Sequence, residues 1–185
     1  KKFGAKFQSQ KNNLPLVLKV LENPKKINFK EDKGSAQVKT SIIFAALKTN
    51  GVSTIKAKKS RNHSELLLKY LKVPIKIKKA KNYDFIQVRG INKINNLNYK
   101  IPGDISSCSF FIVLTILSKN SKLLIRNVNI NPSRIGIIEI LKRMGASIKM
   151  INKKEYKGEK IADIIVKSSK NLRGINCPTK FNSSA

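Results

Sequence analysis

The sequence predicts an α+β protein built from repeated two-layer βαβαββ units. Residues 35–56 align with residues 105–126 at an offset of 70 residues, and residues 59–77 align with residues 132–150 at an offset of 73. In each stretch, apolar residues first recur with the spacing of a helix and then alternate as they do in a strand. Two neighbouring copies of one supersecondary unit explain this pattern.

The first unit is complete and lies at about 25–90. Ser35 can accept a hydrogen bond from an unpaired N–H group of the first helical turn, so a helix is expected to begin there. Gly51 can end that helix in a left-handed conformation. The periodicity predicts helices at 35–49 and 62–71 and strands at 27–31, 52–56, 75–79 and 85–89.

The second unit, at about 97–168, repeats this order. Ser133 is predicted to cap its second helix and Gly145 to end it. Residues 152–160, which are mostly polar, are expected to form the loop between the last two strands. The predicted helices are 106–118 and 133–144, and the predicted strands are 98–101, 123–128, 147–151 and 161–167.

The chain is predicted to hold parts of two domains, at 1–101 and 102–185. An Asn-rich connector at 91–100 and the Pro102-Gly103 pair mark the boundary. The first residue is Lys1, and the opening resembles residues 143–148, where a helix runs into a strand. We therefore expect the chain to begin inside an earlier copy of the unit and to stop where another helix could start.

The excess of basic over acidic residues bears on which ligands the protein can bind. Lys and Arg total 39 against 10 Asp and Glu, a formal net charge of +29. The lysines are scattered through every segment, and with 6% aromatic residues and no Trp, surfaces for stacking nucleic-acid bases are scarce. We expect no nucleic-acid or membrane partner, although a positive field attracts a small phosphorylated ligand.

Two cysteines and one histidine are too few to predict a metal site. They favour a reduced, cytoplasmic protein. The longest apolar run, 110–117, is far shorter than the roughly 20 residues of a membrane-spanning helix, and no signal-peptide pattern opens the chain.

Four motifs, in matching order and spacing over nearly the whole chain, resemble those of the 5-enolpyruvylshikimate-3-phosphate synthase family. They are Ser35-Ala36-Gln37-Val38-Lys39, Lys59-Ser60-Arg61-Asn62-His63-Ser64-Glu65, Pro102-Gly103-Asp104-Ile105-Ser106-Ser107 and Asn131-Pro132-Ser133-Arg134-Ile135-Gly136. The resemblance implies two domains of three βαβαββ units each, of which this chain would be a central fragment. It also implies transfer of an enolpyruvyl group from phosphoenolpyruvate to the 5-hydroxyl of shikimate 3-phosphate, without cofactor or metal, by an enzyme that is monomeric at full length.

The resemblance also implies substrate-binding residues. Ser35 and Ala36 would hold the substrate phosphate, Gln37 would contact the substrate ring and the phosphoenolpyruvate side, and Arg61 would be a secondary phosphate contact. The residues by themselves allow this, because a helix N-terminus attracts anions and a guanidinium binds phosphate in bidentate fashion. They also allow a plain N-cap at Ser35, a solvent-facing Gln37 and a surface Arg61; the repeat of the Ser-Arg pair at Arg134 favours a role in the fold.

No catalytic residue is predicted within the chain. His63 is expected to be structural, Asp104 to cap the helix after it, and Cys108 to be a small buried side chain. Asn62 stands where the family commonly has Asp. Because the family's other catalytic groups would lie outside this chain, we expect the isolated polypeptide to be inactive. Two alternatives remain: a UDP-N-acetylglucosamine enolpyruvyl transferase, which relies on a cysteine loop not seen here, and a basic nucleic-acid-binding module.

Overall fold

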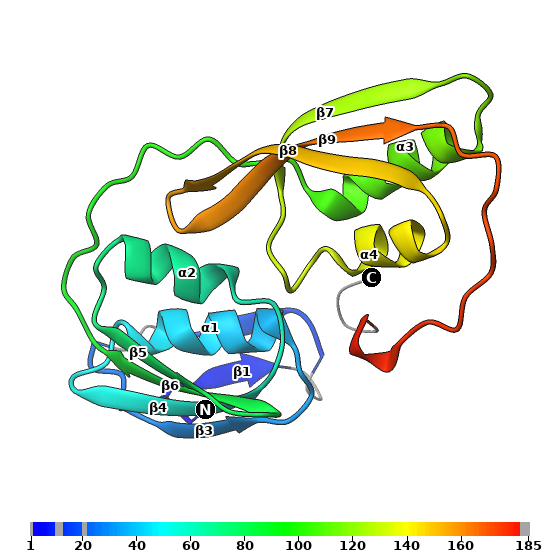
Figure 1. The fold of residues 1–185 in the computed structure, drawn as a ribbon. Coiled ribbons are helices and arrows are strands. Elements are labelled where there is room, and N and C mark those ends of the chain that lie inside the picture. The colour runs from blue at the N-terminus through cyan, green and yellow to red at the C-terminus, as the bar shows by residue number, and fades with distance from the viewer. Residues whose placement is uncertain (1, 10–12, 20–21, 182–185) are drawn as a thin grey trace. The chain divides into compact units, whose positions relative to one another are not determined.

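The computed structural model describes residues 2–9, 13–19 and 22–181 of the chain (Figure 1). It confirms the predicted α+β class, with helices and sheets in separate layers. The chain divides into two compact units. Unit 1 contains Lys1–Ser60 and Leu68–Asn96, and unit 2 contains Arg61–Leu67 and Leu97–Ala185.

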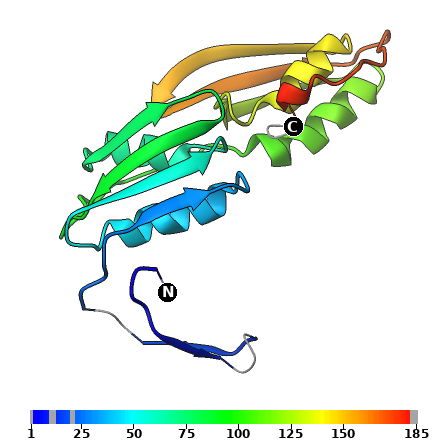
Figure 2. The ribbon, with the colours of Figure 1, turned by 90° about the horizontal axis from the view of Figure 1, so that it is seen from below.

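Unit 1 is a four-stranded sheet covered by helices on one face. Its strand order is β3-β4-β6-β5, in which β3 and β4 are parallel and the other pairs are antiparallel. Figure 2 shows these strands as one layer with the helices behind it. The elements are β3 (Asn28–Glu31), α1 (Ala36–Ala46), β4 (Val52–Lys58), β5 (Ile75–Lys79) and β6 (Tyr83–Arg89), preceded by an antiparallel pair, β1 (Phe7–Ser9) and β2 (Leu16–Leu18). Helix α2 (His63–Tyr70) is divided between the units: its residues up to Leu67 belong to unit 2 and the rest to unit 1.

Buried apolar and more exposed side chains alternate along the strands of unit 1, which explains why the sheet packs against the helices with one face. Ile55 in β4 lies opposite Ile86 in β6, and both are buried, whereas their sequence neighbours point to the other face. Ile43 and Ala46 of α1 are fully buried in the same core. The sheet and helix periodicities therefore place one apolar face of each element in a common core.

Unit 2 repeats the architecture with its first strand reduced to a single bridge. Its sheet has the order β7-β9-β8, with both pairs antiparallel, and Gly103 forms a parallel bridge to Val128 where β3 runs beside β4 in unit 1. Its core is equally aliphatic. The elements are α3 (Ile105–Leu117), β7 (Lys122–Asn129), α4 (Gly136–Arg143), β8 (Ser147–Tyr156), β9 (Glu159–Lys167) and a 3₁₀ turn at Thr179–Phe181.

The structure corrects three predictions for unit 2. Residues 98–101 do not form a strand. Residues 152–160 are not a long loop, because β8 and β9 continue to a two-residue turn at Lys157 and Gly158, both of which have a positive φ. Ser133 does not cap α4: its hydroxyl donates to Asn131 Oδ1, and the helix begins only at Gly136.

The predicted helix end at Gly145 is confirmed, because α4 has Met144 as its C-cap and Gly145 follows with a φ of 99°. The prediction that Gly51 ends α1 is wrong: α1 ends at Ala46 with Leu47 as its C-cap, and Gly51, whose φ is 113°, directly precedes β4. At Gly145 the backbone N–H donates to the Lys142 carbonyl, and the next N–H, of Ala146, donates to the Leu141 carbonyl. This pair of hydrogen bonds satisfies carbonyl groups that the end of α4 would leave unpaired.

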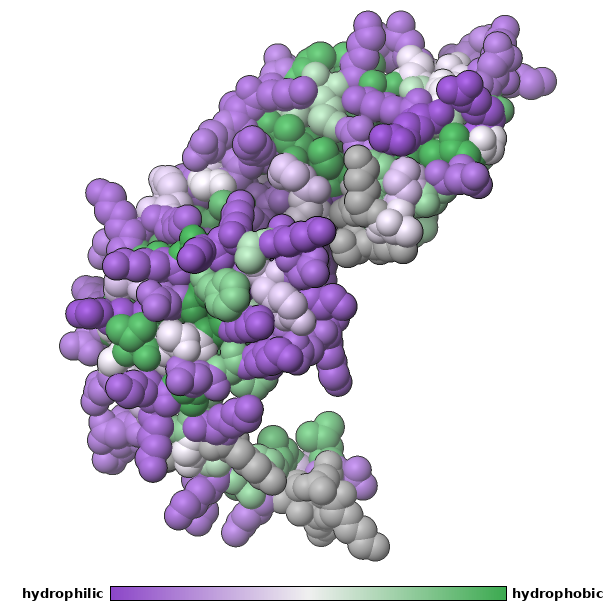
Figure 3. Space-filling model, turned by 60° about the horizontal axis from the view of Figure 1, so that its bottom comes forward, coloured by the Kyte–Doolittle hydropathy of each residue, from purple (hydrophilic) through white to green (hydrophobic). Residues whose placement is uncertain are grey.

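The surface is rich in hydrophilic side chains, interrupted by smaller hydrophobic patches (Figure 3). Among the described residues, none of the helices is both long enough and apolar enough to cross a membrane.

Candidate functional site

The predicted phosphate-binding turn is the start of α1 in unit 1. Ser35 has an extended backbone, with φ −85° and ψ 113°, and its Oγ accepts a hydrogen bond from the Val38 N–H at 3.3 Å. The Ser35 carbonyl accepts from the Lys39 N–H at 3.0 Å. Ser35 is therefore a true N-cap, which fixes the direction in which the first turn of α1 presents its N–H groups.

A buried carboxylate organises the segment before this cap. Glu31, the last residue of β3, is 3% exposed. Its Oε1 accepts from the N–H groups of Lys33 and Ser35 at 2.9 and 3.1 Å, and its Oε2 accepts from the Gly34 N–H at 3.0 Å. Gly34 has a φ of 74°, which allows the chain to curl around the carboxylate. These three N–H groups already have an anionic partner from the protein itself.

Two N–H groups of the helix start remain for a ligand. In the part of the chain that the structure describes, the backbone N–H groups of Ala36 and Gln37 have no acceptor. Gln37 is exposed and Ala36 is half-buried. With the Ser35 hydroxyl, these groups form the arrangement of donors that binds anions at helix N-termini.

The four predicted binding residues are divided between the two units. Ser35, Ala36 and Gln37 lie on consecutive positions in unit 1, whereas Arg61 is exposed and belongs to unit 2, two residues before α2 begins.

Unit 2 contains a buried polar network around Glu159, the first residue of β9. Glu159 is 4% exposed, and its Oε1 lies 2.5 Å from His63 Nδ1. Its Oε2 accepts from Asn129 Nδ2 at 3.1 Å and Asn131 Nδ2 at 3.2 Å. The network joins the first residue of α2 to the last residue of β7 and the first residue of β9. His63 thus pairs with a buried carboxylate, and its structural role stays a prediction.

The network also joins the motif at 59–65 to the motif at 131–136 by a hydrogen bond. Asn131 Nδ2 also donates to Asn62 Oδ1 at 3.0 Å, while Asn131 Oδ1 accepts from the backbone N–H and the hydroxyl of Ser133. Burial alone would raise the pKa of Glu159, but the hydrogen bonds from His63, Asn129 and Asn131 outweigh it, so the pKa lies below its ordinary value.

The start of α3 is capped by Asp104, as predicted. Asp104 Oδ2 accepts from the N–H and the hydroxyl of Ser107, each at 3.3 Å. Arg134 forms an ion pair with Asp104 Oδ1 and donates to Ser106 Oγ at 2.8 Å. Burial would raise the pKa of Asp104, yet the charge of Arg134 and the hydrogen bonds of the helix start lower it overall. Arg134 therefore serves the fold, so the repeated Ser-Arg pair does not by itself mark a ligand contact.

Sequence reasoning missed Glu31 and Glu159, the two buried carboxylates of these arrangements. Among only 10 acidic residues, a carboxylate three positions before a Gly-Ser pair is a usable signal for Glu31. No comparable signal exists for Glu159, because its partners are 28 to 96 residues away along the chain. Both cysteines are free thiols, and the described residues hold no group of side chains suited to a metal ion.

Nearly the whole chain is similar to proteins of one known family. The family model of EPSP synthase (3-phosphoshikimate 1-carboxyvinyltransferase) matches residues 1–181. The 3-phosphoshikimate 1-carboxyvinyltransferase of Endomicrobium trichonymphae is 44% identical over 168 residues, which are 90% of this chain and 38% of the relative. That of Petrotoga mobilis is 41% identical over 94% of this chain and 40% of its own length.

A solved structure gives the same result. The EPSP synthase of Acinetobacter baumannii superposes with a TM-score of 0.81 at 34% identity, over 95% of this chain and 39% of that protein. The chain therefore spans about two-fifths of the length of the relatives that it matches.

Proposed function

The chain belongs to the EPSP synthase family, and on that premise we propose that it forms part of a 3-phosphoshikimate 1-carboxyvinyltransferase. In this reaction the enolpyruvyl group of phosphoenolpyruvate is transferred to the 5-hydroxyl of shikimate 3-phosphate, with release of phosphate, on the route to aromatic amino acids. The match over residues 1–181 is the single observation that carries the proposal.

The chain's share of the chemistry is to bind phosphate. We propose that the Ser35 hydroxyl and the N–H groups of Ala36 and Gln37 hold the 3-phosphate, and that the side chain of Gln37 reaches the substrate ring. The Ser35 cap supports this, because it orients the two N–H groups that have no acceptor in the described chain. Arg61, in unit 2, is proposed as a further phosphate contact because a guanidinium pairs with phosphate oxygens.

We further propose a cytoplasmic location and a monomeric state for the full-length enzyme. Two free thiols, Cys108 and Cys177, fit a reducing compartment such as the cytoplasm.

A charge placed at Ser35 tests the proposed role of the turn. Ser35→Asp keeps an N-cap as good as serine but puts a carboxylate where the phosphate would lie. We expect the chain to bind shikimate 3-phosphate in isothermal titration calorimetry and Ser35→Asp to lose this binding. Ser41→Asp is the matched control, because Ser41 is exposed on the same helix and its hydroxyl donates only to the Val38 carbonyl among the described contacts.

Two results would contradict the proposal. Equal weakening by Ser35→Asp and Ser41→Asp would mean that any negative charge on α1 acts, without a site at Ser35. Binding of shikimate 3-phosphate that survives Ser35→Asp, in a variant with unchanged circular dichroism, would place the phosphate elsewhere.

A further inference from the structure

The sheet of unit 1 has a second face that neither its core nor the Ser35 turn uses. Residues directly opposite each other in neighbouring strands share a face. The register therefore places one set of side chains away from the buried core. This outer face consists of Asn28 and Lys30 in β3, Val52, Thr54, Lys56 and Lys58 in β4, Tyr83, Phe85, Gln87 and Arg89 in β6, and Lys76 and Lys78 in β5.

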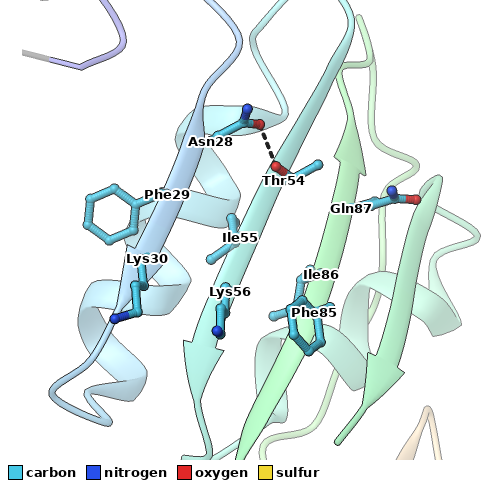
Figure 4. Close-up of a pocket in the computed structure, with 9 residues that line it drawn as sticks. All are labelled: Asn28, Phe29, Lys30, Thr54, Ile55, Lys56, Phe85, Ile86 and Gln87. Atoms are coloured by element: carbon cyan, nitrogen blue, oxygen red, sulfur yellow. Dashed lines mark hydrogen bonds between the residues drawn. The ribbon is translucent and has the colours of Figure 1, made fainter.

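One row of the outer face collects positive charge around an aromatic ring. Lys30 lies opposite Lys56, Lys56 opposite Phe85, and Phe85 opposite Lys78. Figure 4 shows Lys30, Lys56 and Phe85 side by side across their strands. Like charges directly opposite each other destabilise a sheet, so this row opposes folding and favours an anionic ligand.

The charge of the outer face is not balanced by its own residues. None of the outer-face residues in these four strands, all of which the structure describes, is acidic. Asp32, just after β3, pairs with Lys30 at 2.9 Å and accepts from the Tyr83 hydroxyl at 3.1 Å. It thus offsets one lysine at the margin, while Lys76 and Lys78 are exposed on the opposite side of Phe85.

Phe85 is accessible and lies between two open hollows. Its side chain is 43% exposed. One hollow, of about 420 Å³, lies over β3, β4 and β6, and the other, of about 450 Å³, lies over β5 and β6. Phe85 and Gln87 line both hollows. A planar group in either hollow can therefore lie against the ring, and the Gln87 amide can donate to it or accept from it.

These features fit one class of ligand best. An acidic peptide would use the lysines but not the exposed ring, and an aromatic metabolite would use the ring but not a row of cations that crosses the sheet. Single-stranded nucleic acid uses both, because its phosphates pair with lysines while its bases stack on aromatic side chains. Lys56 Nζ already lies 4.8 Å from the centre of the Tyr83 ring and 5.7 Å from that of Phe85, where it can contact a phosphate beside a stacked base.

We propose that the outer face of the β3-β4-β6-β5 sheet binds single-stranded nucleic acid, with a base stacked on Phe85 and phosphates paired with Lys56, Lys76 and Lys78. The prediction of no nucleic-acid partner rested on the scattering of lysines through every segment and on the scarcity of aromatic residues along the whole chain. The fold places two of them, Tyr83 and Phe85, on one basic face. This proposal is independent of the phosphate site at Ser35.

Two variants of the whole chain separate stacking from charge. Binding is followed by the fluorescence anisotropy of a labelled oligouridylate of about 12 nucleotides, over a series of KCl concentrations. For Lys56→Gln/Lys78→Gln we expect at least tenfold weaker binding at about 0.1 M KCl and a salt slope smaller by about 1.4, because two phosphate contacts are lost. For Phe85→Leu we expect binding weaker by about 5- to 100-fold with an unchanged salt slope, because one stacked base is lost.

The controls decide whether the effect belongs to this face. Lys149→Gln/Lys153→Gln removes the same charge from exposed positions of β8 in unit 2 and should change binding less than threefold. Heparin, a polyanion without bases, should respond to the lysine variant but not to Phe85→Leu. Circular dichroism and thermal unfolding verify that each variant is folded.

Several outcomes would overturn the proposal. It fails if oligouridylate does not bind, if the β8 control weakens binding as much as Lys56→Gln/Lys78→Gln, or if Phe85→Leu binds as the unchanged chain does. Tighter binding of a polyglutamate peptide than of oligouridylate would also contradict it and would identify the face as a site for acidic peptides.

Discussion

Glu31 shows how a single residue defines the Ser35 turn. A carboxylate normally repels a phosphate, yet this one is buried and directed at three N–H groups of its own chain. It therefore orders the loop before Ser35 and occupies the N–H groups of Lys33, Gly34 and Ser35. In the proposed phosphate site Glu31 is a positioning residue, because it would act only through the backbone that it holds.

Replacing this carboxylate should loosen the turn. Glu31→Gln keeps one oxygen but loses the other acceptor and the charge, so we expect the free energy of unfolding to fall by about 1–3 kcal/mol. Urea denaturation measures this loss. Asp32→Asn is the matched control: Asp32 is exposed, and its ion pair with Lys30 and its hydrogen bond from Tyr83 lie at the surface, so this variant should lose clearly less stability than Glu31→Gln. Equal losses would show that the hydrogen bonds to Glu31 add nothing.

Glu159 makes the stability of the chain depend on pH. A carboxyl whose pKa is depressed in the folded protein stabilises it above the ordinary value of 4.5, and this contribution is lost as the pH falls through the depressed value. We therefore expect the difference in unfolding free energy between the unchanged chain and Glu159→Gln to be large near pH 7 and to shrink as the pH falls below 4.5 and through the depressed pKa of Glu159.

Glu155→Gln is the control for this titration. Glu155 is exposed in the neighbouring strand β8, so its variant should follow the unchanged chain at every pH. If Glu159→Gln and Glu155→Gln gave parallel pH profiles in urea denaturation, the Glu159 network would not be the source of the acid sensitivity.

At the scale of the elements, the two units share one topology but differ in the residues that cap their helices. The helix after the first strand position is capped by Ser35 in unit 1 and by Asp104 in unit 2. The strand orders β3-β4-β6-β5 and β7-β9-β8 correspond, with Gly103 at the place of β3. The two units can pack their helices on the sheet in the same way with different caps, because a cap acts through hydrogen bonds to the first turn of its own helix.

At Gly90, just after β6, the backbone lies close against the segment that follows α1. A Cβ atom at Gly90 would lie 1.7 Å from the carbonyl oxygen of Thr49, just beyond α1. Because the clash is with backbone, the end of β6 or of α1 must move, and we expect Gly90→Ala to lower the free energy of unfolding by at least about 2 kcal/mol.

The control for this substitution is in unit 2. At Gly174 an added Cβ meets no atom within 4 Å. Gly174→Ala should therefore change the free energy of unfolding by less than about 0.5 kcal/mol. Thermal and urea unfolding of the two variants measure the contrast, and a Gly90→Ala variant as stable as Gly174→Ala would show that the contact relaxes without cost.

At the scale of the whole molecule, the chain holds about two-fifths of the length of its relatives. Stabilising a transition state requires many groups that converge on one substrate. We expect the isolated chain to release no phosphate above background from phosphoenolpyruvate and shikimate 3-phosphate in a coupled assay. A full-length relative serves as the positive control, and measurable turnover by the chain would contradict the expectation.

Most of the elements could be predicted because their signals are local. The predicted strand 75–79 is observed at Ile75–Lys79, and the helix predicted at 106–118 is observed at Ile105–Leu117. The error at 98–101 has a tertiary cause, because strand formation depends on pairing with distant residues. In the described part of the chain, none of these residues pairs with another strand, and the bridge to Val128 is made only by Gly103.

The sequence by itself determined the α+β class, the repeated unit and the resemblance to the family, because periodicity, turn residues and short motifs are encoded by near neighbours. Only the tertiary structure decided which carboxylates hold the Ser35 turn and His63, and which face of the first sheet collects lysines around Phe85. The physical reason is that hydrogen bonds and cross-strand rows join residues far apart in the chain, so their partners exist only once the sheets have paired.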